Sequence, residues 1–267
     1  MEFSDWIKDK NIKNTLRIQE NIFEWTVDDE KYILKRIDGL SEYLIQKELN
    51  QLKLPVFQKK NLLLYSNEPI EDILNFETKD PEAIKERERE RGKQREQESY
   101  GYTNKDKFYI LMKKINGTPL KFILDQLSSE ELETIIQIIF WSLKICWDKL
   151  EFVHLDLHLK NILIQKLEEP VTIILDTEDK LLEIETLYIP FIIDFEDSIT
   201  GRYPNESILT KKTVLHDLWT FLGILTLFVK DSKKYQVVLN YLSYFIDPLT
   251  FQEKKEFYAR QGFRILP

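Results

Sequence analysis

The sequence predicts an α+β protein with two lobes, a small β-rich amino-terminal lobe followed by a larger helical one. Three observations lead to this prediction. Residues 16–37 have the pattern of a hairpin, residues 132–147 have the apolar spacing of a buried helix, and most of the chain after them favours helices too. With 267 residues, 43% of them hydrophobic, the chain has enough apolar material to bury one large core or two.

The first lobe is expected to span residues 1–112. It should begin with a hairpin, in which a strand-like segment at residues 16–27 and a strand at 31–37 are joined by a turn at Asp28-Asp29. A helix at residues 41–54 and two more strands, at 62–65 and 108–112, should follow. Pro55 should end the helix because proline cannot continue one. Between the last two strands, residues 79–99 contain almost no apolar residue, so we expect an exposed, charged insertion there.

The second lobe is expected to span residues 113–267. Ser128 followed by Glu131 is a capping-box pattern, and it precedes the longest apolar helix of the chain. Further on, residues 162–164, 171–175 and 191–195 are short β-like runs, which predicts a β-rich insertion at about residues 166–190.

Composition excludes several classes of protein. The single cysteine, Cys146, excludes a disulfide framework, and three histidines do not favour a poly-histidine metal site. The net charge of -8 argues against a dedicated nucleic-acid-binding protein, and the longest apolar stretch is too short to span a membrane. The first residues do not have the pattern of a secretory signal, so we expect an intracellular protein, cytoplasmic or nuclear.

The segment from residue 152 to residue 163, FVHLDLHLKNIL, carries the most chemical information. It follows the long helix and leads into a strand, so its polar side chains lie on a loop between rigid elements. Asp156 is suited to accept a proton from a hydroxyl, while Asn161 offers an oxygen to a metal ion. Asp194, at the end of a later apolar strand, offers a second oxygen of the kind that Mg²⁺ prefers. Together these residues predict a phosphoryl-transfer site.

These motifs resemble those of the protein-kinase fold, whose catalytic loop reads H-R-D-x-x-x-x-N and whose metal-binding loop reads D-F-G. Here the strings are H-L-D-L-H-L-K-N, from His154 to Asn161, and D-F-E, from Asp194. The resemblance implies a bilobal kinase-like fold with ATP and Mg²⁺ as cofactors. Asp156 would be the catalytic base, and Asn161 and Asp194 would hold the metal and so the nucleotide.

The same resemblance assigns further residues. It aligns Tyr32-Ile33-Leu34-Lys35 with the kinase strand that carries the phosphate-binding lysine, and it makes a helix glutamate the ion-pair partner of Lys35. We prefer Glu48 for that partner because of its distance from the helix end; Glu42 is the competing choice. Residues 111–117 resemble the hinge, and their nucleotide-binding positions would be Met112, Lys113 and Ile115.

Two histidines and one aspartate complete the assignments that the resemblance implies. His154 would brace the catalytic loop by hydrogen bonding, and Asp217, in the string His216-Asp217-Leu218-Trp219, would brace it from the start of a central helix. His158 is a candidate catalytic residue that steadies the transferring phosphate, or else it fills space. A histidine two residues after the catalytic aspartate, together with the β-rich insertion before Asp194, is similar to haspin-like and other atypical kinases. Low Gly and Ala with abundant Ile, Lys, Asn and Glu would suit an AT-rich genome such as that of a large DNA virus, which would place the protein in a host cell or virion.

The resemblance implies a protein kinase that phosphorylates Ser or Thr hydroxyls of a protein substrate. Residues 16–27 contain no glycine, however, so the backbone cannot approach phosphates as a glycine-rich loop does. This departure keeps open a pseudokinase that binds a partner without catalysis. A third possibility is a small-molecule phosphotransferase of the aminoglycoside or choline kinase type, in which similar loops occur. The sequence does not predict an oligomeric state.

Overall fold

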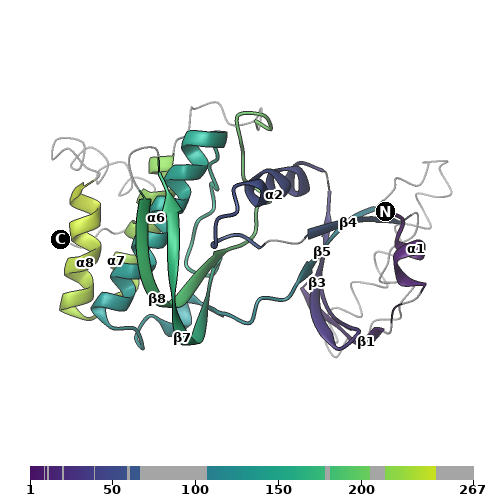
Figure 1. Cartoon of the computed structure of the whole chain (residues 1–267), viewed down its shortest axis with the longest axis horizontal. Helices are drawn as coiled ribbons and strands as arrows, with labels where there is room; N and C mark the ends of the chain where they lie inside the picture. The colour runs from purple at the N-terminus through teal and green to yellow at the C-terminus, as the bar shows by residue number, and fades with distance from the viewer. Residues whose placement is uncertain are drawn as a thin grey trace. The chain divides into compact units, whose positions relative to one another are not determined.

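The computed structural model describes residues 1–8, 10, 12–19, 21–38, 40–58, 61–66, 107–177, 181–204 and 214–244. It divides the chain into two compact units, as the predicted fold class requires. One comprises Met1–Leu44 with Gln58–Lys114, and the other comprises Ile45–Phe57 with Ile115–Pro267. Figure 1 shows that the strands of the first unit precede the helices of the second along the chain, so the predicted α+β class is confirmed.

The first unit is built on a five-stranded antiparallel sheet with the strand order β1-β2-β3-β5-β4 (Figure 1). Its strands are β1 Ile12–Gln19, β2 Ile22–Val27, β3 Glu30–Ile37, β4 Asn61–Ser66 and β5 Lys107–Lys113. A short helix, α1 Phe3–Ile7, precedes them, and α2 Ser41–Gln51 begins in this unit and ends in the next.

One face of this sheet forms the core of the first unit. Along β2, burial alternates with a period of two, so that Phe23, Trp25 and Val27 point inward. Helix α1 covers that face, with the rings of Phe3 and Trp6 centred 5.8 and 6.1 Å from the ring of Trp25. Residues of even number on β3, such as Leu34, belong to the same face, so Ile33 and Lys35 belong to the opposite one.

Two tight turns shape the first three strands. The predicted turn at Asp28-Asp29 is confirmed: both residues have positive φ, 50° and 67°, as the two central residues of a type I′ hairpin turn require. The predicted single strand over residues 16–27 is wrong. It is two strands, and the pairing of Gln19 with Ile22 leaves only two residues in the connection. Neither residue is Gly or Pro, and a single Asn at position 21 was too weak a turn signal to divide the segment.

Besides the end of α2, the second unit contains four helices among its described residues, α5 Leu120–Ile123, α6 Ser129–Leu150, α7 Val214–Phe228 and α8 Ser232–Tyr244. The predicted capping box at the start of α6 is confirmed: Ser128 Oγ accepts from Glu131 N at 3.1 Å, and Glu131 Oε2 accepts from Ser128 N at 2.7 Å. The apolar positions that predicted this helix are all buried, namely Ile135, Ile136, Ile139, Leu143 and Cys146.

A long antiparallel ribbon packs against α6 (Figure 1). It consists of β7 Ile162–Asp176 and β8 Leu181–Ile192, and the short strand β6 Thr118–Pro119 pairs with the start of β7. The β-rich insertion expected at residues 166–190 lies within this ribbon. The ribbon matters for the site because β7 begins directly after the loop of Asp156, and β8 ends directly before Asp194.

The two units differ from the predicted lobes at the end of α2 and at residues 113–114, which belong to the first unit. All residues up to 112 were expected in the first lobe, but Ile45–Phe57 belongs to the second unit. The reason is burial: Ile45, Leu49, Val56 and Phe57 are part of the hydrophobic core of the second unit. All residues after Lys114 belong to the second unit. The charged insertion expected at residues 79–99 lies outside the described residues.

Within the described part of the chain, no helix is both long and apolar enough to cross a membrane.

Candidate functional site

The loop between α6 and β7 carries the candidate catalytic residues, and a buried carboxylate holds it. Asp217 on α7 is fully buried and accepts two backbone hydrogen bonds, from His154 N to Oδ2 at 2.6 Å and from Leu155 N to Oδ1 at 2.9 Å. Leu155 has a φ of 68°, a conformation that costs a non-glycine residue about 1–2 kcal/mol. Asp217 thus holds the backbone immediately before Asp156 in a strained geometry, and the bracing role implied by the resemblance has a structural basis.

Burial also changes the acidity of Asp217. Loss of solvent raises the pKa of its carboxyl group from 3.8 to about 7, although the backbone N–H groups of His154 and Leu155 oppose this increase. The folded state therefore holds the proton of Asp217 more tightly than the unfolded chain does.

This shift predicts a pH dependence of stability. Because the folded pKa lies above the unfolded one, the contribution of Asp217 is fully present below about pH 3.8 and is lost as the pH rises to about 7. We expect the free energy of unfolding of the wild type, relative to that of Asp217→Asn, to fall from about pH 5 to about pH 7, by up to about 1.4 kcal/mol per pH unit. Urea denaturation of both proteins at several pH values measures this difference. Two parallel curves would contradict the prediction.

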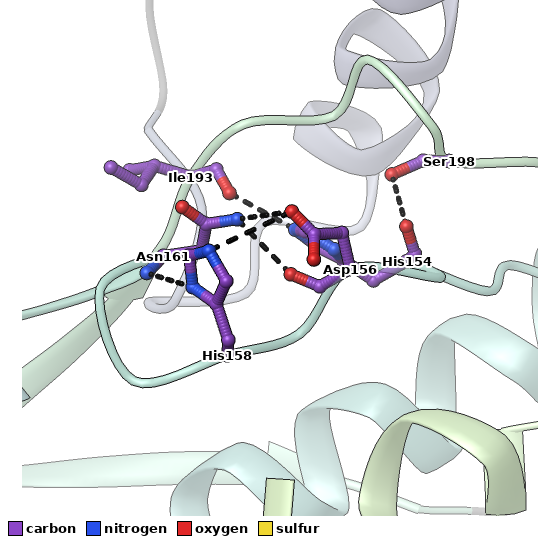
Figure 2. A network of polar contacts seen from close by, with 6 residues as sticks. All are labelled: His154, Asp156, His158, Asn161, Ile193 and Ser198. Carbon is purple, nitrogen blue, oxygen red and sulfur yellow. Dashed lines mark hydrogen bonds and ion pairs between the residues drawn. The ribbon is translucent and has the colours of Figure 1, made fainter. Parts of the chain in front are cut away.

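His154 braces the same loop from the opposite side. Its Nε2 lies 3.0 Å from the carbonyl oxygen of Ile193, which can only accept, so Nε2 carries the hydrogen (Figure 2). Ser198 Oγ donates to the carbonyl oxygen of His154 at 3.2 Å. The imidazole is fully buried beside the ring of Phe195, 5.5 Å between centroids, and burial lowers its pKa. A neutral, buried ring of this kind is structural, as expected for His154.

Asp156 and Asn161 lie together in the structure (Figure 2). The side-chain nitrogen of Asn161 donates to Asp156 Oδ2 at 3.1 Å and to the Asp156 carbonyl oxygen at 3.0 Å. Both bonds use Nδ2, so Oδ1 of Asn161 keeps its capacity to bind a cation. The Asp156 side chain is 49% exposed, which leaves it accessible to a substrate hydroxyl.

Asp194 reaches this loop through the strand that precedes it. Ile193 N donates to the backbone oxygen of Asn161 at 3.0 Å, so the segments that carry Asn161 and Asp194 lie side by side. Asp194 itself is exposed and has a φ of 66°. A carboxylate and an amide oxygen on adjacent segments suit Mg²⁺, which usually takes few protein ligands and is completed by water and phosphate oxygens. No group of three or more His, Cys, Asp or Glu side chains that could hold a metal occurs among the described residues.

The phosphate-binding candidate, Lys35, lies in the first unit and forms a buried ion pair. Its Nζ is 3.1 Å from Glu42 Oε1, and the two side chains are only 10% and 6% exposed. This finding corrects the expected pairing with Glu48. Glu42 and Glu48 are six residues apart, which places them about 120° apart around the helix, so they do not face the same way. We preferred Glu48 for its distance from the helix end, but that distance does not tell which side of the helix a residue faces.

Glu48 has other partners, within the second unit. Arg202 Nη1 lies 2.9 Å from Glu48 Oε1, and Thr200 Oγ1 donates to Oε2 at 3.4 Å. Glu48 therefore anchors the segment that follows Asp194-Phe195-Glu196. Arg202 and Thr200 were not predicted as site residues, and no sequence motif marks either of them.

The two glutamates can be told apart by mutation. For the ATP-dependent activity that the resemblance implies, we expect Glu42→Gln to lower kcat/KM for ATP more than tenfold, about 1.4 kcal/mol, because it removes a charged partner from buried Lys35. Glu48→Gln should cost far less, because the Arg202 side chain is 74% exposed and water replaces its partner. Steady-state kinetics with varied ATP measure both. The opposite order would restore Glu48 as the functional partner.

The three hinge candidates lie around the unit boundary. Met112 pairs with Ile33 and Asn61 in the sheet, so it shares the sheet face of Lys35. The carbonyl oxygen of Lys113 accepts a hydrogen bond from the Gln58 side chain, and its Nζ is paired with Glu30. Ile115 belongs to the second unit and packs beside Gly117: a Cβ added to Gly117 would lie 3.3 Å from Cγ2 of Ile115. A nucleotide-binding role for these residues remains a proposal.

Comparison with known proteins finds similarity in structure but not in sequence. No family model matches the sequence, and no curated protein sequence matches it. Among solved structures, the chain is similar to the kinase PK-1 of the Cydia pomonella granulovirus. The two chains are 13% identical, the alignment covers 93% of this chain and 79% of that chain, and the TM-score is 0.45.

The chain has the order of elements that the resemblance to kinases implied. In this chain an antiparallel five-stranded sheet has a helix between β3 and β4, and a mainly helical unit follows. In that unit the H-L-D-L-H-L-K-N loop joins α6 to β7, and the D-F-E string follows β8. These are the positions that the resemblance to kinases implied.

Proposed function

We propose that the protein is an ATP- and Mg²⁺-dependent kinase that transfers the γ-phosphoryl group to Ser or Thr hydroxyls of a protein substrate. The observation that carries the proposal is the bond between Asn161 Nδ2 and Asp156 Oδ2, in a loop fixed by Asp217. That bond sets a proton-accepting carboxylate beside an oxygen ligand for a cation, on one accessible loop.

In the proposed reaction, Asp156 orients the substrate hydroxyl and takes its proton as the hydroxyl oxygen bonds to phosphorus and the bond to the ADP oxygen breaks. Lys35, held by Glu42, would contact the α- and β-phosphates, and Met112, Lys113 and Ile115 would meet the adenine. Asn161 and Asp194 would hold Mg²⁺, which when bound offsets the negative charge of the phosphates. The residues of the loop need not move far, because backbone bonds already fix them.

One observation favours a second candidate, a pseudokinase. The connection between β1 and β2 is only two residues long and contains no glycine, so side chains limit how closely its few backbone amides can approach phosphates. Weak nucleotide binding would follow from this.

The test is transfer of labelled phosphate from ATP to mixed casein and histone substrates, with and without Mg²⁺. Parallel reactions contain small hydroxyl compounds such as aminoglycosides and choline. Mg²⁺-dependent labelling of protein supports the proposal, and labelling of the small compounds alone would overturn the protein-substrate assignment. If no substrate is labelled and ATP with Mg²⁺ does not raise the melting temperature, the pseudokinase reading replaces it.

A further inference from the structure

Each ring nitrogen of His158 faces one of the two polar residues of the proposed site. Nδ1 accepts the backbone N–H of Asn161 at 3.1 Å, and Nε2 lies 3.7 Å from Asp156 Oδ2 (Figure 2). The side chain is 38% exposed, so filling the core does not explain its placement. His158 thus stands between Asp156 and Asn161 and contacts both.

The hydrogen-bonding pattern fixes which nitrogen carries the hydrogen. The backbone N–H of Asn161 can only donate, so Nδ1 must be an unprotonated acceptor. A neutral imidazole has one N–H, which is then on Nε2 and directed toward Asp156. The backbone N–H of Asn161 is shared between two acceptors of His158, the carbonyl oxygen at 2.9 Å and Nδ1 at 3.1 Å, and His158 N donates to the Asp156 carbonyl oxygen at 2.9 Å.

The two oxygens of the Asp156 carboxylate are consequently not equivalent. Oδ2 accepts from Asn161 Nδ2 and faces His158 Nε2. Oδ1 makes no hydrogen bond with any residue that the structure describes. An oxygen that already has donors is a poorer proton acceptor than one without, so the arrangement favours Oδ1 for that task.

We propose that His158 is a positioning residue of the phosphoryl-transfer site: its Nδ1 accepts the backbone N–H of Asn161, and its Nε2–H faces Asp156 Oδ2 at 3.7 Å, longer than a hydrogen bond but close enough to attract that oxygen, which leaves Oδ1 to accept the proton of the substrate hydroxyl. This inference rests on the proposed function. It differs from direct contact between His158 and the transferring phosphate, because the ring acts through Asp156 and Asn161.

Two substitutions separate the two contacts. In His158→Asn, the side-chain oxygen lies near the former Nδ1 and can still accept from Asn161 N, but nothing replaces Nε2–H. We expect kcat to fall about tenfold with KM for ATP unchanged, because only the orientation of Asp156 is lost. His158→Phe keeps a ring of similar size without either nitrogen, so we expect a larger loss in kcat together with a several-fold higher KM for ATP. Lys160→Ala, an exposed position in the same loop, is the control and should match the wild type.

Wild-type kinetics for His158→Phe would overturn the proposal and leave His158 as a space-filling residue. Equal losses in kcat for the two variants, with KM unchanged in both, would overturn the part that concerns Nδ1. The measurement also requires circular dichroism of both variants, so that a loss of fold is not mistaken for a loss of positioning.

A second readout does not depend on turnover. Long-range ¹H–¹⁵N spectra of the wild type near pH 8 distinguish the two neutral imidazole tautomers, and the His158→Asn spectrum identifies the His158 signals. We expect the Nε2–H tautomer, and an Nδ1–H tautomer would overturn the proposal. If the wild type transferred no phosphate, the proposed function would be wrong. The tautomer would still test separately whether Nδ1 of His158 accepts the Asn161 N–H and Nε2–H faces Asp156.

Discussion

Replacing Asp156 with Asn is expected to lower kcat by a factor of about 10²–10⁴ and to leave the fold intact. The substitution keeps the size of the side chain, and its oxygen can still accept the bond from Asn161 Nδ2. What it removes is the ability to take a proton, because an amide has no basic oxygen at neutral pH. The loss should therefore appear in kcat, with little change in KM for ATP. Transfer of labelled phosphate to protein, with ATP varied, measures both constants.

The matched control is Asp197→Asn, which makes the same chemical change at an exposed acid in the segment after Asp194-Phe195-Glu196. It should retain wild-type kinetics, which would show that loss of one negative charge near the loop is not enough to explain the effect. If Asp156→Asn kept the wild-type kcat, Asp156 would not be the base. Equal losses in both variants would point instead to a general electrostatic effect.

The contacts that could be expected from the sequence depend on short-range patterns. Ser128 and Glu131 are three residues apart, and their side chains and backbone meet in the first turn of α6. Asp156 and Asn161 are five residues apart on a loop between two elements with strong patterns of their own. Their proximity follows from this short spacing, although Asp217, more than 60 positions away, holds the backbone immediately before Asp156.

The contacts that could not be predicted depend on the direction in which a side chain points and on partners far away in the sequence. The spacing of residues in α2 does not say which side of the helix faces Lys35, so Glu48 was preferred where Glu42 forms the pair. The contacts of Glu48 are more than 150 positions away, with Thr200 and Arg202. The roles of His158 likewise depend on the orientation of an imidazole ring, which no spacing rule provides.

Removal of the Asp194 carboxylate is expected to abolish Mg²⁺-dependent transfer and to leave the fold intact. Oxygen ligands for Mg²⁺ are few in the proposed site, so the loss of the charged one should reduce transfer at least about 10²-fold. The positive φ of 66° at this position decides which variant is informative. Alanine in that conformation costs the folded state about 1 kcal/mol or more, whereas asparagine tolerates it, so Asp194→Asn removes the charge with less strain.

Two measurements distinguish a metal-binding role of Asp194 from a structural one. In the wild type, ATP with Mg²⁺ should raise the melting temperature, because a ligand that binds only the folded state stabilises it. Both Asp194→Ala and Asp194→Asn should lose that increase, but without ligand only the alanine variant should melt measurably lower than the wild type. If Asp194→Asn kept both the Mg²⁺-dependent stabilisation and full turnover, the charge at position 194 would be dispensable and the metal assignment wrong. If it lost turnover but kept the stabilisation, Asp194 would act on the reacting phosphate after the nucleotide has bound, and Asn161 would be the more important ligand in the ground state.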